Sequence, residues 1–199
     1  MVKSRSTPDI WMIVATLGIL AIGVVMVYSA SAVAAFHDYG DKFYYVKRQL
    51  IFAGIGIASM FAMMNIDYIR WKKWAPAALL VCFAMLLVVL IPGVGVVRGG
   101  ARSWLGIGSL GIQPSEFMKL AMILFLARML SERQNELNSF TRGLLPPLAI
   151  LGTAFGLIML QPDLGTGAVM IGASLLVIFV AGARISHLAG LAAIGAVGF

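Results

Sequence analysis

Charged residues are scarce in this chain of 199 residues: they make up 12% of the sequence, whereas 61% of the residues are hydrophobic. Soluble domains carry about twice that share of charge, so the composition excludes an ordinary soluble fold. Cysteine occurs once, as Cys82 within an apolar run, which excludes an intramolecular disulfide. No linker or charge run is long enough for a separate soluble domain, so we expect residues 1–199 to form one integral membrane domain.

Several common functional signatures are missing too. The sequence has no metal-ligand spacing, no nucleophile–histidine arrangement and no redox motif. Its glycine-rich segment lacks the Gly-Lys-Ser/Thr signature of a nucleotide loop. Lysine and arginine outnumber aspartate and glutamate by 15 to 8. In a membrane protein this excess indicates loops that face the anionic lipid bilayer, so we expect no nucleic-acid partner.

Long apolar runs are the main feature of the sequence. Six of them are close to the length that crosses a bilayer: Ile10–Ala35, Leu50–Ile66, Trp74–Ile91, Pro114–Leu130, Leu144–Leu160 and Gly165–Gly182. A seventh begins near Ile185 and reaches Phe199, about 15 residues where a span needs about 20. We therefore expect an all-α, polytopic bundle of transmembrane helices, with the chain ending inside its seventh span.

The basic residues predict how the spans are oriented. With a cytoplasmic N-terminus, nine lysine and arginine residues lie on the inner side and five on the outer side, which is the bias of cytoplasmic loops. We expect a multi-pass plasma membrane protein with its N-terminus in the cytoplasm. Whichever orientation holds, counting spans places four segments on one face: Tyr39–Arg48, the Arg98–Gln113 loop, the start of the Pro114 run and the Gln161-Pro162-Asp163 turn.

A carboxylate and an amine stand at the start of the fourth run. In Gln113-Pro114-Ser115-Glu116, proline suits a first helical turn because its missing N–H needs no partner there. Glu116 suits the positive end of the helix dipole, and Lys119 follows three residues later on the same helix face. Two interpretations stay open: an ion pair within a capped helix, or a charged wall of an outward-facing cavity in which Lys119 meets an anionic substrate.

Two other polar segments share that face. Arg98-Gly-Gly-Ala-Arg102 predicts a flexible loop with two guanidinium groups, which match the oxygens of a diphosphate or of anionic lipid headgroups. Asp163 either caps the helix that follows it or lies as an ionisable group at a cavity mouth. Gly165 and Gly167 predict a close approach between helices.

Five strings, taken in order along the whole chain, resemble the shape, elongation, division and sporulation family, whose members include RodA, FtsW and SpoVE. They are Tyr28–Ser31, Lys47–Leu50, Gly100–Trp104, Gln113–Leu120 and Gln161–Thr166. The resemblance implies a bundle of about ten spans, of which this chain would hold about seven. It also implies an enzyme of cell division, cell shape or sporulation that polymerises lipid-linked disaccharide–pentapeptide (lipid II) into glycan strands at the outer membrane face, with a class B penicillin-binding protein as partner.

The resemblance implies a set of site residues as well. Matching the family's polar residues that line an outer cavity are Arg102, Glu116, Lys119 and Asp163, joined by Lys47 and Arg48. Arg102 and Lys119 would stabilise the departing diphosphate, and Glu116 would hold Lys119. The family's proposed catalytic aspartate lies after span seven, so no residue of this chain takes that role, and we expect residues 1–199 alone to be inactive. The chemistry is either acid–base or assisted by a divalent metal.

Two alternatives from other classes stay open. A lipid II flippase needs a polar path across the bilayer, whereas the ionisable residues here gather at one face and the middles of the spans are nearly uncharged. A non-catalytic scaffold would recruit a penicillin-binding protein through apolar helix faces, and it would not need charged residues at one outer face. Polymerisation is therefore the function that the sequence favours.

Overall fold

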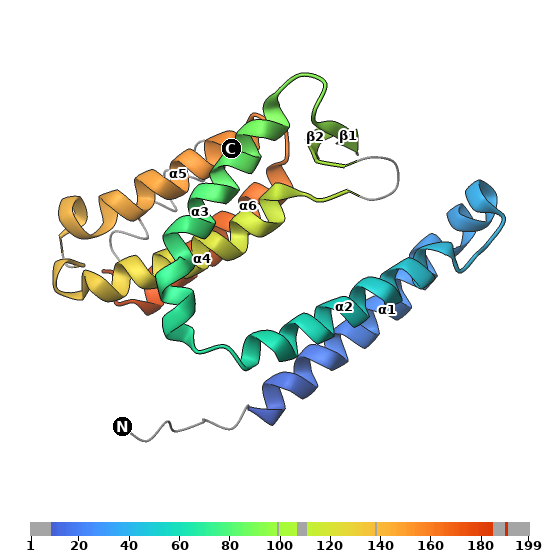
Figure 1. Cartoon of the computed structure of the whole chain (residues 1–199), viewed down its shortest axis with the longest axis horizontal. Coiled ribbons are helices and arrows are strands. Elements are labelled where there is room, and N and C mark those ends of the chain that lie inside the picture. The colour runs from blue at the N-terminus through green and yellow to red at the C-terminus, as the bar shows by residue number, and fades with distance from the viewer. Residues whose placement is uncertain (1–8, 99, 107–110, 138, 185–189, 191–199) are drawn as a thin grey trace. The chain divides into compact units, whose positions relative to one another are not determined.

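Helices account for nearly all of the regular structure in this computed structural model (Figure 1). It describes residues 9–98, 100–106, 111–137, 139–184 and 190. Within these residues the chain forms six α-helices and one pair of short strands. The chain divides into two units, Met1–Asp67 and Tyr68–Phe199, and each is described by itself.

The first unit is a helical hairpin of α1 (Ile10–Tyr39) and α2 (Tyr44–Met64). The carboxylate of Asp9 accepts the Trp11 N–H at 2.9 Å, which caps the start of α1. Gly40 ends α1 in the left-handed conformation (φ 69°), which glycine adopts without steric cost. Among the described residues of this unit, Ala35 is the one buried side chain, so the hairpin has almost no core of its own.

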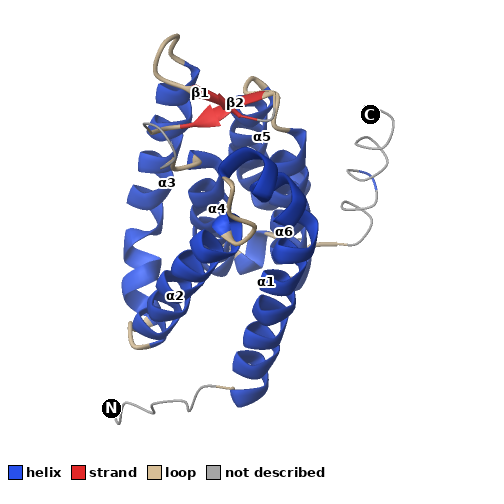
Figure 2. Ribbon diagram, turned by 90° about the vertical axis from the view of Figure 1, so that its right-hand side faces the viewer, coloured by secondary structure: helices blue, strands red, loops and turns tan. Residues whose placement is uncertain are grey.

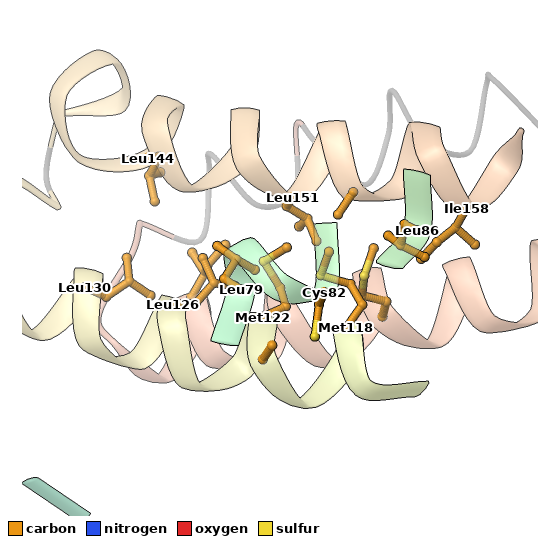
Figure 3. Packing of buried hydrophobic residues seen from close by; sticks show 14 of the residues in the cluster. Leu79, Cys82, Leu86, Met118, Met122, Leu126, Leu130, Leu144, Leu151 and Ile158 are labelled. Atoms are coloured by element: carbon orange, nitrogen blue, oxygen red, sulfur yellow. The ribbon is translucent and has the colours of Figure 1, made fainter. Parts of the chain in front are cut away.

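Four helices form the second unit: α3 (Tyr68–Leu90), α4 (Pro114–Glu132), α5 (Leu145–Met159) and α6 (Leu164–Val180). Buried residues recur at steps of three and four on α3 and α4, which places them on one face of each helix. On these faces lie Leu79, Cys82 and Leu86 of α3, with Met118, Met122, Leu126 and Leu130 of α4. Figure 3 shows them beside Leu144, Leu151 and Ile158, and Met170 and Ile178 of α6 belong to the same apolar core.

A close approach between α5 and α6 depends on Gly167. A Cβ at this position would lie 2.9 Å from Cε2 of Phe155, a distance that real Cβ atoms essentially never show. The predicted role of Gly167 in helix packing is therefore confirmed. The same prediction for Gly165 is wrong, because no described atom lies within 4 Å of the place where its Cβ would stand.

The segment between α3 and α4 differs from the flexible loop that its glycines predict. It forms an antiparallel pair of strands, β1 (Val96–Arg98) and β2 (Ala101–Trp104), with Gly100 at a φ of 87° in the turn. A further bridge pairs Leu105 with Ile112, next to the start of α4. The strands lie at one end of the helices of the second unit (Figure 2). Glycine here permits a tight turn between paired strands, and so does not by itself indicate flexibility.

All six apolar runs that fall on described residues form helices, although their ends differ from the ends of the runs. The run that begins at Leu50, for example, is part of a helix that begins at Tyr44. In the described part of the chain, four helical segments are long and apolar enough to cross a membrane: α1, α2, α3 and Phe140–Met159, which joins a π-helical turn (Phe140–Leu144) to α5. Helix α6 has 17 residues, and α4 carries charges at both ends. The seventh predicted span lies, apart from residue 190, outside the described residues.

Candidate functional site

The start of α4 is built as its sequence predicts. Pro114 occupies the first turn and Glu116 is the acidic residue of that turn, where a carboxylate interacts favourably with the helix dipole. Pro114 and Ser115 are buried, whereas Glu116 is exposed. The helix therefore begins inside the protein while its first charged side chain reaches the surface.

Lys119 and Glu116 form an ion pair on α4. The Nζ atom of Lys119 donates to Oε1 of Glu116 at 2.7 Å, across one helical step. The Lys119 side chain is 22% exposed and that of Glu116 is 52% exposed. This is the ion pair within a helix, one of the two interpretations that the sequence left open; a substrate-binding role of Lys119 stays a prediction. The lysine ammonium also has three donors, so one bond to Glu116 leaves it able to bind an anion.

Gln113 and Asp163 join the two Gln-Pro motifs. Nε2 of Gln113 donates to Oδ2 of Asp163 at 2.7 Å, although the two residues are 50 positions apart in the chain. The other carboxylate oxygen, Oδ1, accepts the backbone N–H of Thr166 at 3.2 Å and so caps α6. The structure thus confirms both the predicted cap and the prediction that the two motifs share one side of the protein. The sequence analysis missed Gln113 as a linking residue; its signal was the repeated Gln-Pro pair.

Gln161 makes a second link at the same end. Its side chain is fully buried, and its Nε2 atom donates to the carbonyl oxygen of Leu86, in the last turns of α3, at 3.3 Å. The sequence analysis did not single out this glutamine for any contact. The amide of Gln161 thus links the α5–α6 turn to α3, and the amide of Gln113 links α4 to the start of α6. Among the described residues, the charged side chains of Glu116 and Lys119 pair only with each other.

Arg102 is exposed on β2, and β2 contacts both α3 and α4. The aliphatic part of its side chain crosses Gly95, since a Cβ on Gly95 would lie 2.7 Å from Cγ of Arg102. Next to it on β2, Ser103 is buried. No hydrogen bond or ion pair between described residues joins Arg102 to Lys119. For Arg98 the structure describes the backbone, as part of β1.

Lys47 and Arg48 belong to the first unit. Nζ of Lys47 lies 2.7 Å from Oδ2 of Asp41, and the guanidinium of Arg48 lies 5.7 Å from the centre of the Phe52 ring. The hydrogen bond from Lys47, with a second from the Phe43 backbone N–H, holds the pKa of Asp41 below its usual value. These two basic residues are thus engaged within their own helical hairpin.

The other end of α4 carries a different set of charges. Oε1 of Glu132 lies 3.3 Å from Nε of Arg128 and 3.4 Å from Nζ of Lys72 on α3. Nη1 of Arg128 also donates to the Lys72 carbonyl at 3.2 Å. At 1.5 Å per helical residue, Glu132 lies about 24 Å from Glu116. Among the described residues, no group of three or more His, Cys, Asp or Glu side chains is arranged to hold a metal ion.

Long apolar helices with ionisable side chains gathered at their ends define a multi-pass helical membrane protein. A family model described as "Cell cycle protein", and named for FtsW, RodA and SpoVE, matches residues 10–199. The chain belongs to this FtsW/RodA/SpoVE family of cell cycle proteins. The resemblance found in the sequence strings is thereby confirmed.

Stage V sporulation protein E of Bacillus subtilis (strain 168) is 54% identical over 199 residues, which are 100% of this chain and 54% of that protein. A probable peptidoglycan glycosyltransferase FtsW of Trichlorobacter lovleyi is 36% identical over 182 residues, which are 92% of this chain and 48% of that protein. The chain thus spans about half the length of the curated relatives it matches.

Two solved structures have the same fold. One is a chain from the work on structural coordination of polymerization and crosslinking by a peptidoglycan synthase complex, with a TM-score of 0.75 and 30% identity over 94% of this chain and 52% of that chain. The other is the Rod shape determining protein RodA of Thermus thermophilus, with a TM-score of 0.66 and 29% identity over 89% of this chain and 58% of that chain.

Proposed function

We propose that this chain forms part of a peptidoglycan glycosyltransferase that joins lipid II into glycan strands at the outer face of the bacterial plasma membrane. The relatives' printed names support this reaction. The observation that carries the proposal is the Lys119–Glu116 pair at the start of α4, which forms within one helix. Ionisable groups beside hydrocarbon are costly, and a diphosphate bound at Lys119 would give this pair a function beyond its place in the first turns of α4.

The reaction needs positive charge where the leaving group departs. A hydroxyl of the acceptor sugar attacks the anomeric carbon of the growing chain, its proton passes to a carboxylate, and the bond from that carbon to the diphosphate oxygen breaks. The lipid diphosphate leaves with the electron pair. Arg102 and Lys119 stabilise this charge, because fixed positive groups act strongly in a cavity that excludes water. Glu116 keeps Lys119 in place, and the carboxylate base comes from protein beyond this chain.

The orientation and the partner follow from the same proposal. The N-terminus lies in the cytoplasm, which the distribution of lysine and arginine favours. The Gln113 end of α4 then faces outward, where lipid II is used. A class B penicillin-binding protein crosslinks the strands as they are made. The peptidoglycan synthase complex, to one chain of which this chain is similar, couples polymerization with crosslinking, which supports such a partner.

Alanine substitutions in the full-length protein test the proposal. We expect Lys119→Ala and Arg102→Ala each to lower the rate of glycan synthesis from labelled lipid II by at least about tenfold, since one lost charge-stabilising donor costs about 10²–10³ in other enzymes. Lys73→Ala is the matched control, because Lys73 is exposed near the start of α3, and we expect it to leave the rate unchanged. Glycan of normal length, made at a normal rate by both site variants, would exclude these roles.

The same purified protein distinguishes polymerisation from lipid transport. Reconstituted into vesicles that contain fluorescent lipid II, it should make glycan without speeding the movement of lipid II between leaflets, as read by quenching with dithionite. If Lys119→Ala abolishes a lipid movement that the wild type catalyses, and leaves glycan synthesis unchanged, the protein is a flippase and the proposal is wrong.

A further inference from the structure

We propose that Asp163 is a positioning residue that, together with Gln113, locks the start of α4 to the start of α6, and that its carboxylate does not contact the substrate. The inference rests on the proposed function for its activity readout. It changes the expected site set, because the family resemblance places Asp163 among the residues that line the substrate cavity.

Each carboxylate oxygen of Asp163 accepts a hydrogen bond from another residue. Oδ1 accepts the N–H of Thr166 at 3.2 Å, and Oδ2 accepts from Nε2 of Gln113 at 2.7 Å. The side chain is partly buried, so these bonds are partly shielded from water. A carboxylate offers about four lone-pair sites, so these two bonds do not saturate Asp163, but they fix its orientation, and a substrate hydroxyl or a metal ion would have to bind without shifting the carboxylate. Breaking either bond would release the cap of α6 or its link to α4.

Gln113 is placed to make this link and does not cap its own helix. It stands in the N-cap position of α4 in an extended conformation, with no side-chain bond to the first turn. Its amide reaches instead to α6, where Nε2 also lies 3.4 Å from Oγ1 of Thr166. Because Gln113 directly precedes the turn that carries Glu116, this bond fixes the Glu116–Lys119 pair relative to α6.

The link uses a neutral partner, and this fits a positioning role. A buried amide that is hydrogen-bonded costs less to desolvate than a second charge would. Gln161 makes the same kind of bond to the carbonyl of Leu86 on α3. Three helices are thus joined at this end by side-chain amides, and the positive groups nearby are left for an anionic ligand.

Exchanging the polarity of the bond provides the test. In full-length protein, Gln113→Glu brings two carboxylates together, and we expect a lower Tm and at least tenfold slower glycan synthesis from lipid II. In the double variant Gln113→Glu/Asp163→Asn, the asparagine Nδ2 donates to the new glutamate while its Oδ1 still caps Thr166. We expect the double variant to recover the wild-type Tm and a rate within about threefold of wild type. Gln134→Glu, on an exposed turn, controls for the added charge.

The single substitution Asp163→Asn gives an independent readout if Gln113→Glu does not fold. Asparagine keeps the cap, and the Gln113 amide can rotate to accept from Nδ2, so we expect activity near wild type. Asp163→Ala loses both bonds, and we expect a lower Tm with a matching loss of rate. The proposal is overturned if Asp163→Asn and the double variant have a wild-type Tm and yet are as inactive as Lys119→Ala. If the wild type makes no glycan, the proposed function fails, while the Tm pattern still tests the lock.

Discussion

The two ends of α4 use their charges differently. At the C-terminal end, Arg128 and Glu132 pair with each other and also reach Lys72 on α3, so these charges join two helices. At the N-terminal end, Glu116 and Lys119 pair within one helix. The helices are joined there by the amides of Gln113 and Gln161.

This difference separates charges that serve the fold from charges that are available for function. Ion pairs near a protein surface contribute about 0–1 kcal/mol each, which suits the modest task of holding two helix ends together. The pair at the N-terminal end joins two positions of the same helix and no second helix among the described residues. Under the proposed function, this is the end where a diphosphate binds, whereas the C-terminal end is joined to α3.

The largest effect is expected at Gly95, which packs against the side chain of Arg102, the second positive group of the proposed diphosphate site. In Gly95→Ala the new Cβ would stand 2.7 Å from Cγ of Arg102 and would also collide with the carbonyl oxygen of Val89. Overpacking of this kind costs about 1–3 kcal/mol, and it displaces the guanidinium. We expect a lower Tm in detergent together with glycan synthesis slowed about tenfold.

Gly152→Ala is the matched control for Gly95→Ala. Gly152 lies within α5, and no described atom lies within 4 Å of its Cβ position. Alanine favours a helix over glycine by about 1 kcal/mol, so Tm should stay or rise and the rate should not change. A Gly95→Ala protein as active and as stable as this control would show that close packing at Gly95 does not position Arg102.

The sequence predicts the helices well and their links poorly, and the reason is physical. Apolar runs and the Pro114–Glu116 signal depend on local chemistry. The sequence therefore predicts that a helix begins at Pro114, and α4 begins there in the structure. The ion pair of Glu116 with Lys119 is also local, one helical step apart. The Gln113–Asp163 bond joins residues 50 positions apart, and only the packing of α4 against α6 brings them together. The β-hairpin was missed because glycine and arginine suit a loop as readily as a tight turn.

A smaller effect is expected when one substitution at each end of α4 is compared for stability and for rate. Arg128→Ala removes a bond to the Lys72 carbonyl and an ion pair with Glu132, and with partial exposure we expect a loss of about 1 kcal/mol in unfolding free energy. Its glycan synthesis should stay near wild type. Lys119→Ala should show the reverse, with a nearly unchanged Tm and a low rate. Thermal unfolding and lipid II polymerisation, measured on the same preparations of each variant, show whether stability and rate change in opposite ways. If Lys119→Ala lowers Tm as much as Arg128→Ala does, the two ends do not differ in the way described.

The smallest effect concerns the ion pair of Lys47 with Asp41, which has the same 2.7 Å length as the pair on α4. Asp41 is partly exposed to solvent, and its hydrogen bonds with Lys47 and the Phe43 N–H hold its pKa below the ordinary 3.8. Because the folded pKa is the lower one, the pair's contribution is complete above about pH 4 and is lost as the pH falls through the folded pKa. We expect Lys47→Ala to raise the pKa of Asp41 toward its ordinary value, as read by NMR titration of the carboxyl carbon, with no measurable change in Tm at pH 7. An unchanged pKa in that variant would mean that Lys47 does not lower the pKa of Asp41, and that the two side chains are not paired in solution.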